Sequence, residues 1–264
     1  MSLVSNDAAI DYPESDGRPM GETDWHIEWT LRLRDMLKLR YRGQKVYVAS
    51  DLLLYYQEGV PRNFVVPDGF VVLDCEQRPR RLFKTWEEHR VPNVVFEFTS
   101  ASTRRSDEVF KPRIYAELGV LEYFIFDPHG EYLKPFLQGH RLVGDNQYER
   151  VAPDNRGRLT CQSLGLTLEI SGGDLLIRDA LTEAPLLTAA EDSDRRAEAS
   201  EHRAEASEHR AEASENRAED LEQIAEMAQR KTQAAMHDAA KLAEQNLILE
   251  TELKRLRQEL EKRG

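Results

Sequence analysis

The feature that most constrains this chain is a seven-residue repeat that begins at Arg196. Successive segments read RAEASEH, RAEASEH, RAEASEN and RAEDLEQ. A repeat of seven places the same side of an α-helix against a partner helix, so it is the sequence signature of a coiled coil. With Ala197 at position a, one register continues to the end of the sequence. Residues 196–264 are therefore expected to form one long helix that packs as a coiled coil.

The predicted contact seam of this helix changes along its length. Its first a and d positions hold Ala and Ser, whereas the d positions from Leu242 onward hold Leu. The C-terminal third should therefore hold the helices together. Arg at g and Glu at the next e would attract in a parallel homodimer, and Asn246 at an a position favours two strands. The alternative is a single charged helix or a hetero-oligomer, because exposed ion pairs contribute little.

The remaining composition predicts a protein without disulfides or membrane segments. Cys75 and Cys161 stand far apart in no CxxC pattern, which predicts neither a disulfide framework nor a zinc site. No apolar stretch reaches the roughly 18 residues of a membrane helix, and no signal-peptide pattern is present. These features favour the cytoplasm. The net charge of −12 argues against polyanion binding over the whole surface, although it allows a local basic patch.

Four segments are predicted along the chain. Residues 1–22 are polar with Pro and Gly, so they are expected to form an N-terminal arm. Residues 23–185 alternate apolar runs with turn residues and should form a globular domain. Residues 186–195 are the expected linker to the coiled coil at 196–264.

Within the globular domain the patterns predict an α/β fold. The apolar runs KVYVAS, DLLLYYQ, NFVVPDGFVVLD and NVVFEFTS have the length and the β-branched and aromatic content of strands. LEYFIFDP follows a predicted helix as another strand, and hairpins are expected after it at the sheet edge. A helix between two strands usually makes them parallel, which predicts a mixed β-sheet flanked by helices.

Two helices are predicted in this domain. Apolar residues recur at helical spacing over 23–41, where Thr23 or Asp24 can act as the N-cap. The segment 107–118 predicts a second helix that begins near its lysine, because the proline that follows is tolerated only in a first turn.

Two carboxylates and a lysine are the candidate catalytic residues. Asp68 lies in a Pro-Asp-Gly turn between two apolar segments, and Glu97 interrupts the apolar run VVFEFTS. A carboxylate in such a strand is costly to bury unless a cation or hydrogen-bond donors meet it. Two carboxylates on neighbouring strands can hold Mg²⁺ or Mn²⁺, and Lys111 can position water or neutralise a phosphate. The combination predicts phosphodiester hydrolysis.

Each of these residues also has an ordinary structural interpretation. Asp68 can serve only the turn, and Glu97 can face solvent together with Thr99 by strand alternation. Lys111 can be a solvated helix lysine, and His26 a surface or capping histidine.

Several longer stretches resemble a known family. YPESDGRPMGETDWH, VYVASDLLLYYQEG, FVVPDGFVV, EFTSASTRRSD and IYAELGVLEYFIFDPHGEYL lie in order within residues 11–178. They are similar to the bacterial Uma-type restriction endonuclease family of the PD-(D/E)xK superfamily. The resemblance implies a restriction-endonuclease-like fold and an Mg²⁺- or Mn²⁺-dependent endonuclease that acts on DNA.

The resemblance also implies roles for single residues. Asp68 corresponds to the PD aspartate and Glu97 to the acidic residue of the second half-motif. Phe and Thr fill the family's x-K position, so the lysine is expected from the next helix, as Lys111. The family's Ser-Pro-Ser is Ser-Ala-Ser here, and apolar residues flank Lys111, which affects its exact placement. Glu22 and His26 fall in the family's ETD-x-H segment and are accessory candidates.

A basic segment is the candidate nucleic-acid surface. Phe83 and Trp86 lie among its charges and could stack on bases. A charged loop rim is the alternative interpretation. The candidate cations are Arg78, Arg80, Arg81, Lys84, Arg90, Arg104, Arg105 and Arg113.

These observations leave three functions open. The first is a metal-dependent DNA endonuclease that dimerises through its tail. The second is a catalytically inactive scaffold that keeps the fold and recruits a partner through the coiled coil. The two differ in whether Asp68 and Glu97 lie close enough to share one cation, within about 8 Å. The third, an RNA-acting nuclease, would use the same site.

Overall fold

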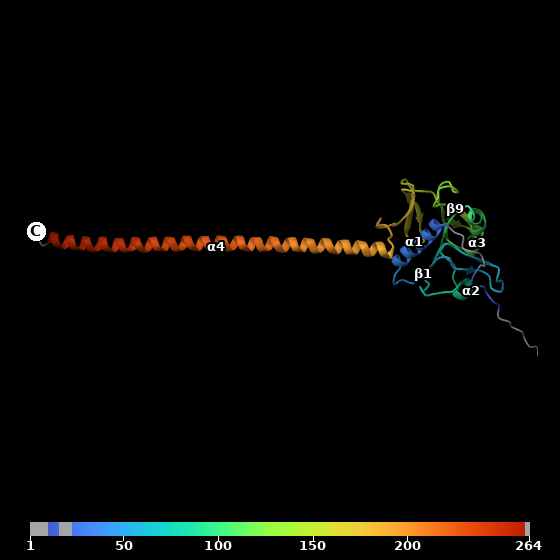
Figure 1. The fold of residues 1–264 in the computed structure, drawn as a ribbon, viewed down its shortest axis with the longest axis horizontal. Helices are drawn as coiled ribbons and strands as arrows, with labels where there is room; N and C mark the ends of the chain where they lie inside the picture. The colour runs from blue at the N-terminus through green and yellow to red at the C-terminus, as the bar shows by residue number, and fades with distance from the viewer. Residues whose placement is uncertain (1–9, 16–22, 262–264) are drawn as a thin grey trace, which may run out of the picture. The chain divides into compact units, whose positions relative to one another are not determined.

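The computed structural model describes residues 10–15 and 23–261 (Figure 1). The chain divides into two compact units, residues 1–193 and 194–264, and every strand of the described residues lies in the first. The helices are α1 (Asp24–Arg40), α2 (Thr85–Glu88), the π-helix η1 (Ser106–Phe110), α3 (Lys111–Leu118) and α4 (Ala189–Glu261). The strands are β1 (Val46–Ala49), β2 (Leu54–Tyr55), β3 (Phe64–Val65), β4 (Gly69–Leu73), β5 (Phe83–Lys84), β6 (Val94–Phe98), β7 (Glu122–Phe126), β8 (Leu137–Val143), β9 (Gln147–Arg150), β10 (Leu159–Cys161), β11 (Leu166–Ser171) and β12 (Asp174–Asp179).

The main sheet has six strands in the order β1-β4-β6-β7-β8-β9. Strands β6 and β7 run parallel, and η1 with α3 forms the crossover between them. The other neighbouring pairs are antiparallel. The predicted mixed α/β sheet with a helix between two parallel strands is therefore confirmed.

Both faces of this sheet are buried, because successive strand residues enter different hydrophobic clusters. Val94, Phe96 and Phe98 of β6 join a cluster with α1 and the strands β10–β12. Val95 joins the cluster on the other face, which includes Tyr115 of α3. All five residues of β6 are buried, so any polar side chain on this strand must find its partners inside the protein.

The late strands differ from the expectation of edge hairpins. Strands β8 and β9 do form a hairpin at the edge of the main sheet. Strands β10–β12 instead form a separate antiparallel sheet. Leu159, Leu166 and Ile177 of that sheet are buried in the same cluster as α1, so burial of its apolar face sets its position.

The helix predictions for the domain are confirmed. Thr23 is the N-cap of α1, and its side chain accepts a hydrogen bond from the backbone N–H of His26. Helix α3 begins at Lys111 with Pro112 in its first turn. Of the expected N-terminal arm, residues 10–15 lie against β2, where the Tyr55 hydroxyl donates to the carbonyl of Pro13 at 2.6 Å.

Helix α4 begins earlier than Arg196, inside the segment 186–195 that was expected to be a linker. Thr188 and Glu191 form a capping box: the Thr188 N–H donates to Glu191 Oε2 at 2.8 Å, and the Glu191 N–H donates to Thr188 Oγ1 at 3.2 Å. Glu191 also pairs with Arg32 of α1 at 2.9 Å. The helix therefore starts where its cap is held by the domain.

In the second unit, α4 continues as one uninterrupted helix to residue 261. Its large apolar side chains are exposed, and Leu242, Leu249, Leu253 and Leu256 each retain more than half of their accessible surface. Across the described residues, no helix combines the length and apolar character needed to cross a membrane.

Candidate functional site

Asp68 is held by two different elements in the turn between β3 and β4. Its Oδ2 accepts a hydrogen bond from the Phe98 N–H of β6 at 2.6 Å, and its Oδ1 lies 3.1 Å from His26 Nε2 of α1. The next residue, Gly69, allows α1 to approach, since a Cβ there would lie 2.9 Å from Leu33 Cδ2. Asp68 is only 6% exposed, so it is more than a surface turn residue.

Glu97 is 1% exposed, so the interpretation in which it faces solvent with Thr99 is wrong. Its position on β6 turns the side chain toward α3. Glu97 Oε2 lies 2.7 Å from Lys111 Nζ, and Oε1 accepts a hydrogen bond from the Tyr115 hydroxyl at 2.5 Å. Glu97 Oε2 also accepts a longer bond, 3.4 Å, from the Asp68 N–H. The two carboxylates predicted from the sequence therefore meet in one buried cluster.

Lys111 joins this cluster and is not a solvated helix lysine. Only 16% of its side chain is exposed, and its Nζ lies 2.9 Å from Asp107 Oδ1 as well as against Glu97. Asp107 is 1% exposed and comes from η1, whose wider turn leads directly into α3. Short π-helical turns of this kind are frequent at functional sites. The sequence interpretation missed Asp107, although its four-residue spacing to Lys111 was a signal.

The electrostatics of the cluster reflect its burial. Burial raises the pKa of Glu97 well above its ordinary value; Lys111 opposes this shift, while Asp68 and Asp107 add to it. Burial also raises the pKa of Asp107. For Asp68, burial is outweighed by the His26 hydrogen bond, the charge of Lys111 and the Phe98 N–H, so its pKa is lowered. The folded protein therefore raises the pKa values of Glu97 and Asp107 and lowers that of Asp68.

Lys111 remains cationic in this environment. Burial alone would lower its pKa, but the charges of Glu97, Asp68 and Asp107 raise it above its ordinary value. A lysine of this kind acts by charge and by hydrogen bonding, and it is not a general base at neutral pH.

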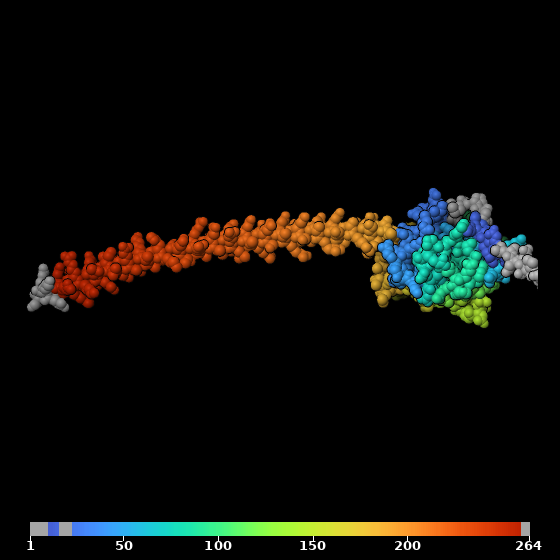
Figure 2. Space-filling model, turned by 90° about the horizontal axis from the view of Figure 1, so that it is seen from below, coloured from blue at the N-terminus to red at the C-terminus, as the bar shows by residue number. Residues whose placement is uncertain are grey.

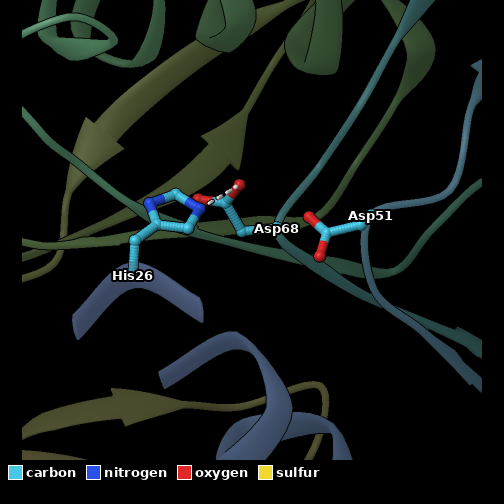
Figure 3. A group of neighbouring side chains, drawn as sticks. All are labelled: His26, Asp51 and Asp68. Carbon is cyan, nitrogen blue, oxygen red and sulfur yellow. Dashed lines mark ion pairs between the residues drawn. The ribbon is translucent and has the colours of Figure 1, made fainter. Parts of the chain in front are cut away.

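A second side of Asp68 faces a group of possible metal ligands, shown in Figure 3. One ligand atom each from His26, Asp51 and Asp68 lies within 4.8 Å of the others. The 3.1 Å between His26 Nε2 and Asp68 Oδ1 is close to the roughly 3 Å expected between adjacent ligands at about 2.1 Å from an octahedral cation. An imidazole and two carboxylates thus fit a divalent cation.

Asp51 is a functional candidate that sequence reasoning missed. It follows β1 with a positive φ of 48°, a conformation that Asp tolerates better than most residues. Its N–H donates to the Pro67 carbonyl at 3.1 Å, which ties its turn to the turn of Asp68. Unlike Asp68, Asp51 is exposed, so this side of the group is open to solvent. The accessory candidate Glu22 lies outside the described residues.

The basic segment is largely paired with acidic side chains. Arg78 and Arg80 both contact Glu88, at 2.7 and 2.8 Å. Phe83 is completely buried and cannot stack on a base, which corrects the sequence interpretation. Of the other candidates, Arg81 pairs with Glu14, Lys84 with Glu87, Arg90 with Asp74 and Arg104 with Glu108, whereas Arg105 stacks on Phe110.

Comparison with known families identifies the domain that carries this cluster. A sequence model of the Uma2 family, described as "Putative restriction endonuclease", matches residues 5–172. The chain belongs to the Uma2 family. The match spans α1 to β11, and so includes the site residues His26, Asp51, Asp68, Glu97, Asp107 and Lys111. The family resemblance inferred from the sequence is confirmed.

One solved structure provides a distant comparison. It is described as a putative nuclease belonging to DUF820 from Anabaena variabilis ATCC 29413. The two chains share 14% sequence identity, and the alignment covers 58% of this chain and 86% of that chain with a TM-score of 0.37. A likeness of this size carries no weight in assigning the site. No curated protein matches the chain.

Proposed function

We propose that the domain expected at residues 23–185, most of which lies in the Uma2 match, is a metal-dependent endonuclease that hydrolyses phosphodiester bonds of DNA. One observation carries the proposal: Asp68, Glu97 and Asp107 are buried in one cluster, where Lys111 pairs with Glu97 and Asp107 and His26 lies against Asp68. Three carboxylates against one ammonium leave two negative charges when all are ionised. Uncompensated buried charge is costly, and a divalent cation would neutralise it.

The proposed metal ligands are Asp68 and Glu97, with His26 and Asp51 on the open side of Asp68. When bound, Mg²⁺ or Mn²⁺ would stabilise charge on the phosphate and lower the pKa of a coordinated water. The distance of 3.4 Å from the Asp68 N–H to Glu97 Oε2 supports a shared site and disfavours the inactive scaffold. The same chemistry applies to RNA, which serves as the comparison substrate in the test.

The remaining residues hold the ligands and place charge. Tyr115 donates its hydroxyl to Glu97 Oε1 and fixes that carboxylate. The Phe98 N–H fixes Asp68 in the same way, from the strand that carries Glu97. Lys111 supplies a permanent positive charge that can orient the attacking water or neutralise the phosphate. These contacts pre-organise the site before any substrate arrives.

Plasmid nicking tests this proposal. The full-length protein should nick supercoiled DNA in Mg²⁺ or Mn²⁺ and not in EDTA, and Asp68→Asn should abolish nicking. The matched control is Asp74→Asn, because Asp74 is an exposed carboxylate at the other end of β4 and Asn tolerates its positive φ of 53°. Equal nicking by wild type and Asp68→Asn, or nicking in EDTA, would refute the proposal.

We also propose that residues 196–264 form a parallel two-stranded coiled coil that makes the protein a homodimer. Leu242, Leu249, Leu253 and Leu256 of α4 are exposed and recur at the heptad positions a and d, which would face a partner helix. Leu side chains gain about 1.5 to 3 kcal/mol each on leaving water. Light scattering on the full-length chain at micromolar concentration tests this directly: a monomer would refute it.

A further inference from the structure

A cavity of about 330 Å³ lies at the edge of the main sheet, between α1, the edge strand β1 and the segment that follows β4. Its lining includes four cationic side chains, Arg34, Lys38, Arg78 and Arg80, and no Asp or Glu. The charged residues of this lining are thus all cationic, in a chain whose net charge is −12. On the face shown in Figure 2, the blue surface of the N-terminal part adjoins the teal surface around residues 75–90.

The charges in this cationic pocket are only partly neutralised. Arg78 and Arg80 share the single carboxylate of Glu88, so together they leave one positive charge. Arg34 and Lys38 have no side-chain hydrogen bond or ion pair with any residue in the described ranges. The lining of the cationic pocket therefore retains about three positive charges, which makes it a site for an anion.

Two further features indicate that the pocket can bind an anion: the contact of Arg80 with Tyr47 and the pKa of Lys38. Arg80 lies 4.0 Å above the ring of Tyr47 and is only 4% exposed, so its guanidinium is fixed before any ligand binds. Burial and the nearby charge of Arg34 lower the pKa of Lys38, against the weaker opposite effect of Asp35. A bound anion would offset the repulsion between these two cations.

The pocket adjoins the candidate metal site. Its lining continues along β1 through Ala49 to Ser50 and resumes at Leu52, the two residues that flank Asp51. An anion in the pocket would therefore lie next to Asp51, one of the proposed metal ligands. Neighbouring phosphates of one nucleic-acid strand could occupy the pocket and the metal site together, whereas an isolated phosphate would occupy only one of them.

We propose that the cationic pocket binds a backbone phosphate of the DNA strand whose neighbouring bond lies in the catalytic site. The proposal rests on the proposed nuclease function and assigns Arg34 and Lys38 as DNA-binding residues, with Arg78 beside them. None of these contacts reads a base, so they position the strand without selecting a sequence.

DNA binding without cleavage tests the pocket independently of catalysis. Fluorescence anisotropy of a labelled 30-base-pair duplex is measured with the full-length protein in EDTA over a series of salt concentrations. The test variant is Arg34→Gln/Lys38→Gln. The matched control, Lys134→Gln/Arg150→Gln, removes the same charge from exposed positions next to and on the strands at the opposite sheet edge.

Loss of the two cations that face this one phosphate should weaken binding at least tenfold at low salt and reduce the slope of log K against log salt by about 1. The control should keep a slope within about half a unit of wild type. Equal effects in the two double variants, or no DNA binding by wild type, would overturn the proposal. So would a loss of inorganic-phosphate binding, measured by thermal shift, with DNA binding unchanged.

The outcomes for the pocket and for catalysis are separable. A wild-type protein that binds DNA through the pocket but never cleaves it would refute the nuclease function and leave the pocket standing. A double variant that binds and cleaves like wild type would refute the pocket and leave the nuclease function standing. Unchanged tryptophan-monitored unfolding of the variant establishes that any loss is local.

Discussion

Replacement of Lys111 by Met tests the buried charge cluster most sharply. The change keeps the aliphatic volume and removes the cation that lies 2.7 Å from Glu97 and 2.9 Å from Asp107. The carboxylates are 0% and 1% exposed as side chains, so neither can recover its lost partner from solvent. Removal of one member of a buried pair costs about 3 to 5 kcal/mol. We expect a loss of that size in the free energy of unfolding at pH 8.

The loss should shrink as the pH falls. Burial holds the pKa values of Glu97 and Asp107 above their ordinary values, and Lys111 opposes both shifts. Without Lys111 both carboxyl groups bind protons still more tightly in the folded state than in the unfolded state. Stability in such a case is retained at low pH and lost as the pH rises through the folded pKa values. The difference between wild type and Lys111→Met should therefore be smaller at pH 5 than at pH 8.

Urea denaturation in EDTA, followed by tryptophan fluorescence, measures this difference. All three tryptophans, Trp25, Trp29 and Trp86, lie in the first unit, so the signal excludes α4. Lys111→Arg is the control, because it keeps a cation and should recover most of the stability. A loss below about 1 kcal/mol at pH 8, or one that grows toward pH 5, would contradict a dry, buried cluster.

Five other changes have expected outcomes. Asp51→Asn should weaken Mn²⁺ binding at least tenfold by calorimetry and leave the unfolding free energy nearly unchanged, because the side chain is exposed. Glu122→Gln should lower stability by about 2 kcal/mol at pH 7. Burial raises the pKa of Glu122, but N–H donors from Ser163 and Gln162 outweigh it and lower the pKa below 4.5. That stability is present above 4.5 and lost as the pH falls further, so the two unfolding curves should converge near pH 3. Deletion of residues 240–264 should give a monomer in light scattering, whereas deletion of 197–217 should leave the dimer, because the Leu-rich part of the seam lies in the former. Asn246→Leu should raise thermal stability and broaden the distribution of oligomers in sedimentation, since a buried amide at an a position favours its own partner; a single dimer species in that variant would contradict the predicted register.

The sequence carried most of the information on the sheet and on the two main carboxylates. The helical spacing of apolar residues predicted α1, the short apolar run NVVFEFTS predicted β6, and the position of Pro112 predicted the start of α3. Glu97 was predicted as a site residue because a carboxylate in an apolar strand needs a partner, and it has Lys111 and Tyr115. These are local consequences of spacing and of the cost of burial.

What the sequence did not predict depends on contacts between distant segments. Asp51 reaches Asp68 because the turn after β1 bonds to Pro67, and no local pattern indicates that bond. Asp107 has the spacing to pair with Lys111, but its burial depends on the contact of η1 with β7, where the Tyr123 hydroxyl donates to the Asp107 carbonyl. The sequence predicted that the basic segment binds DNA, but it did not indicate that Arg78 and Arg80 both pair with Glu88, because that pairing forms only in the folded chain.

Single-turnover cleavage of a labelled DNA duplex over a range of Mg²⁺ concentrations, in wild type and Glu97→Ala, tests the central claim most directly. Glu97 is buried and touches both Lys111 and the Asp68 turn, so its removal takes a charged ligand from the proposed site. We expect the cleavage rate to saturate with Mg²⁺ in wild type and to fall at least a hundredfold in the variant at every concentration. A variant that cleaves at the wild-type rate, with an unchanged dependence on Mg²⁺, would contradict the claim that this buried cluster is the catalytic centre.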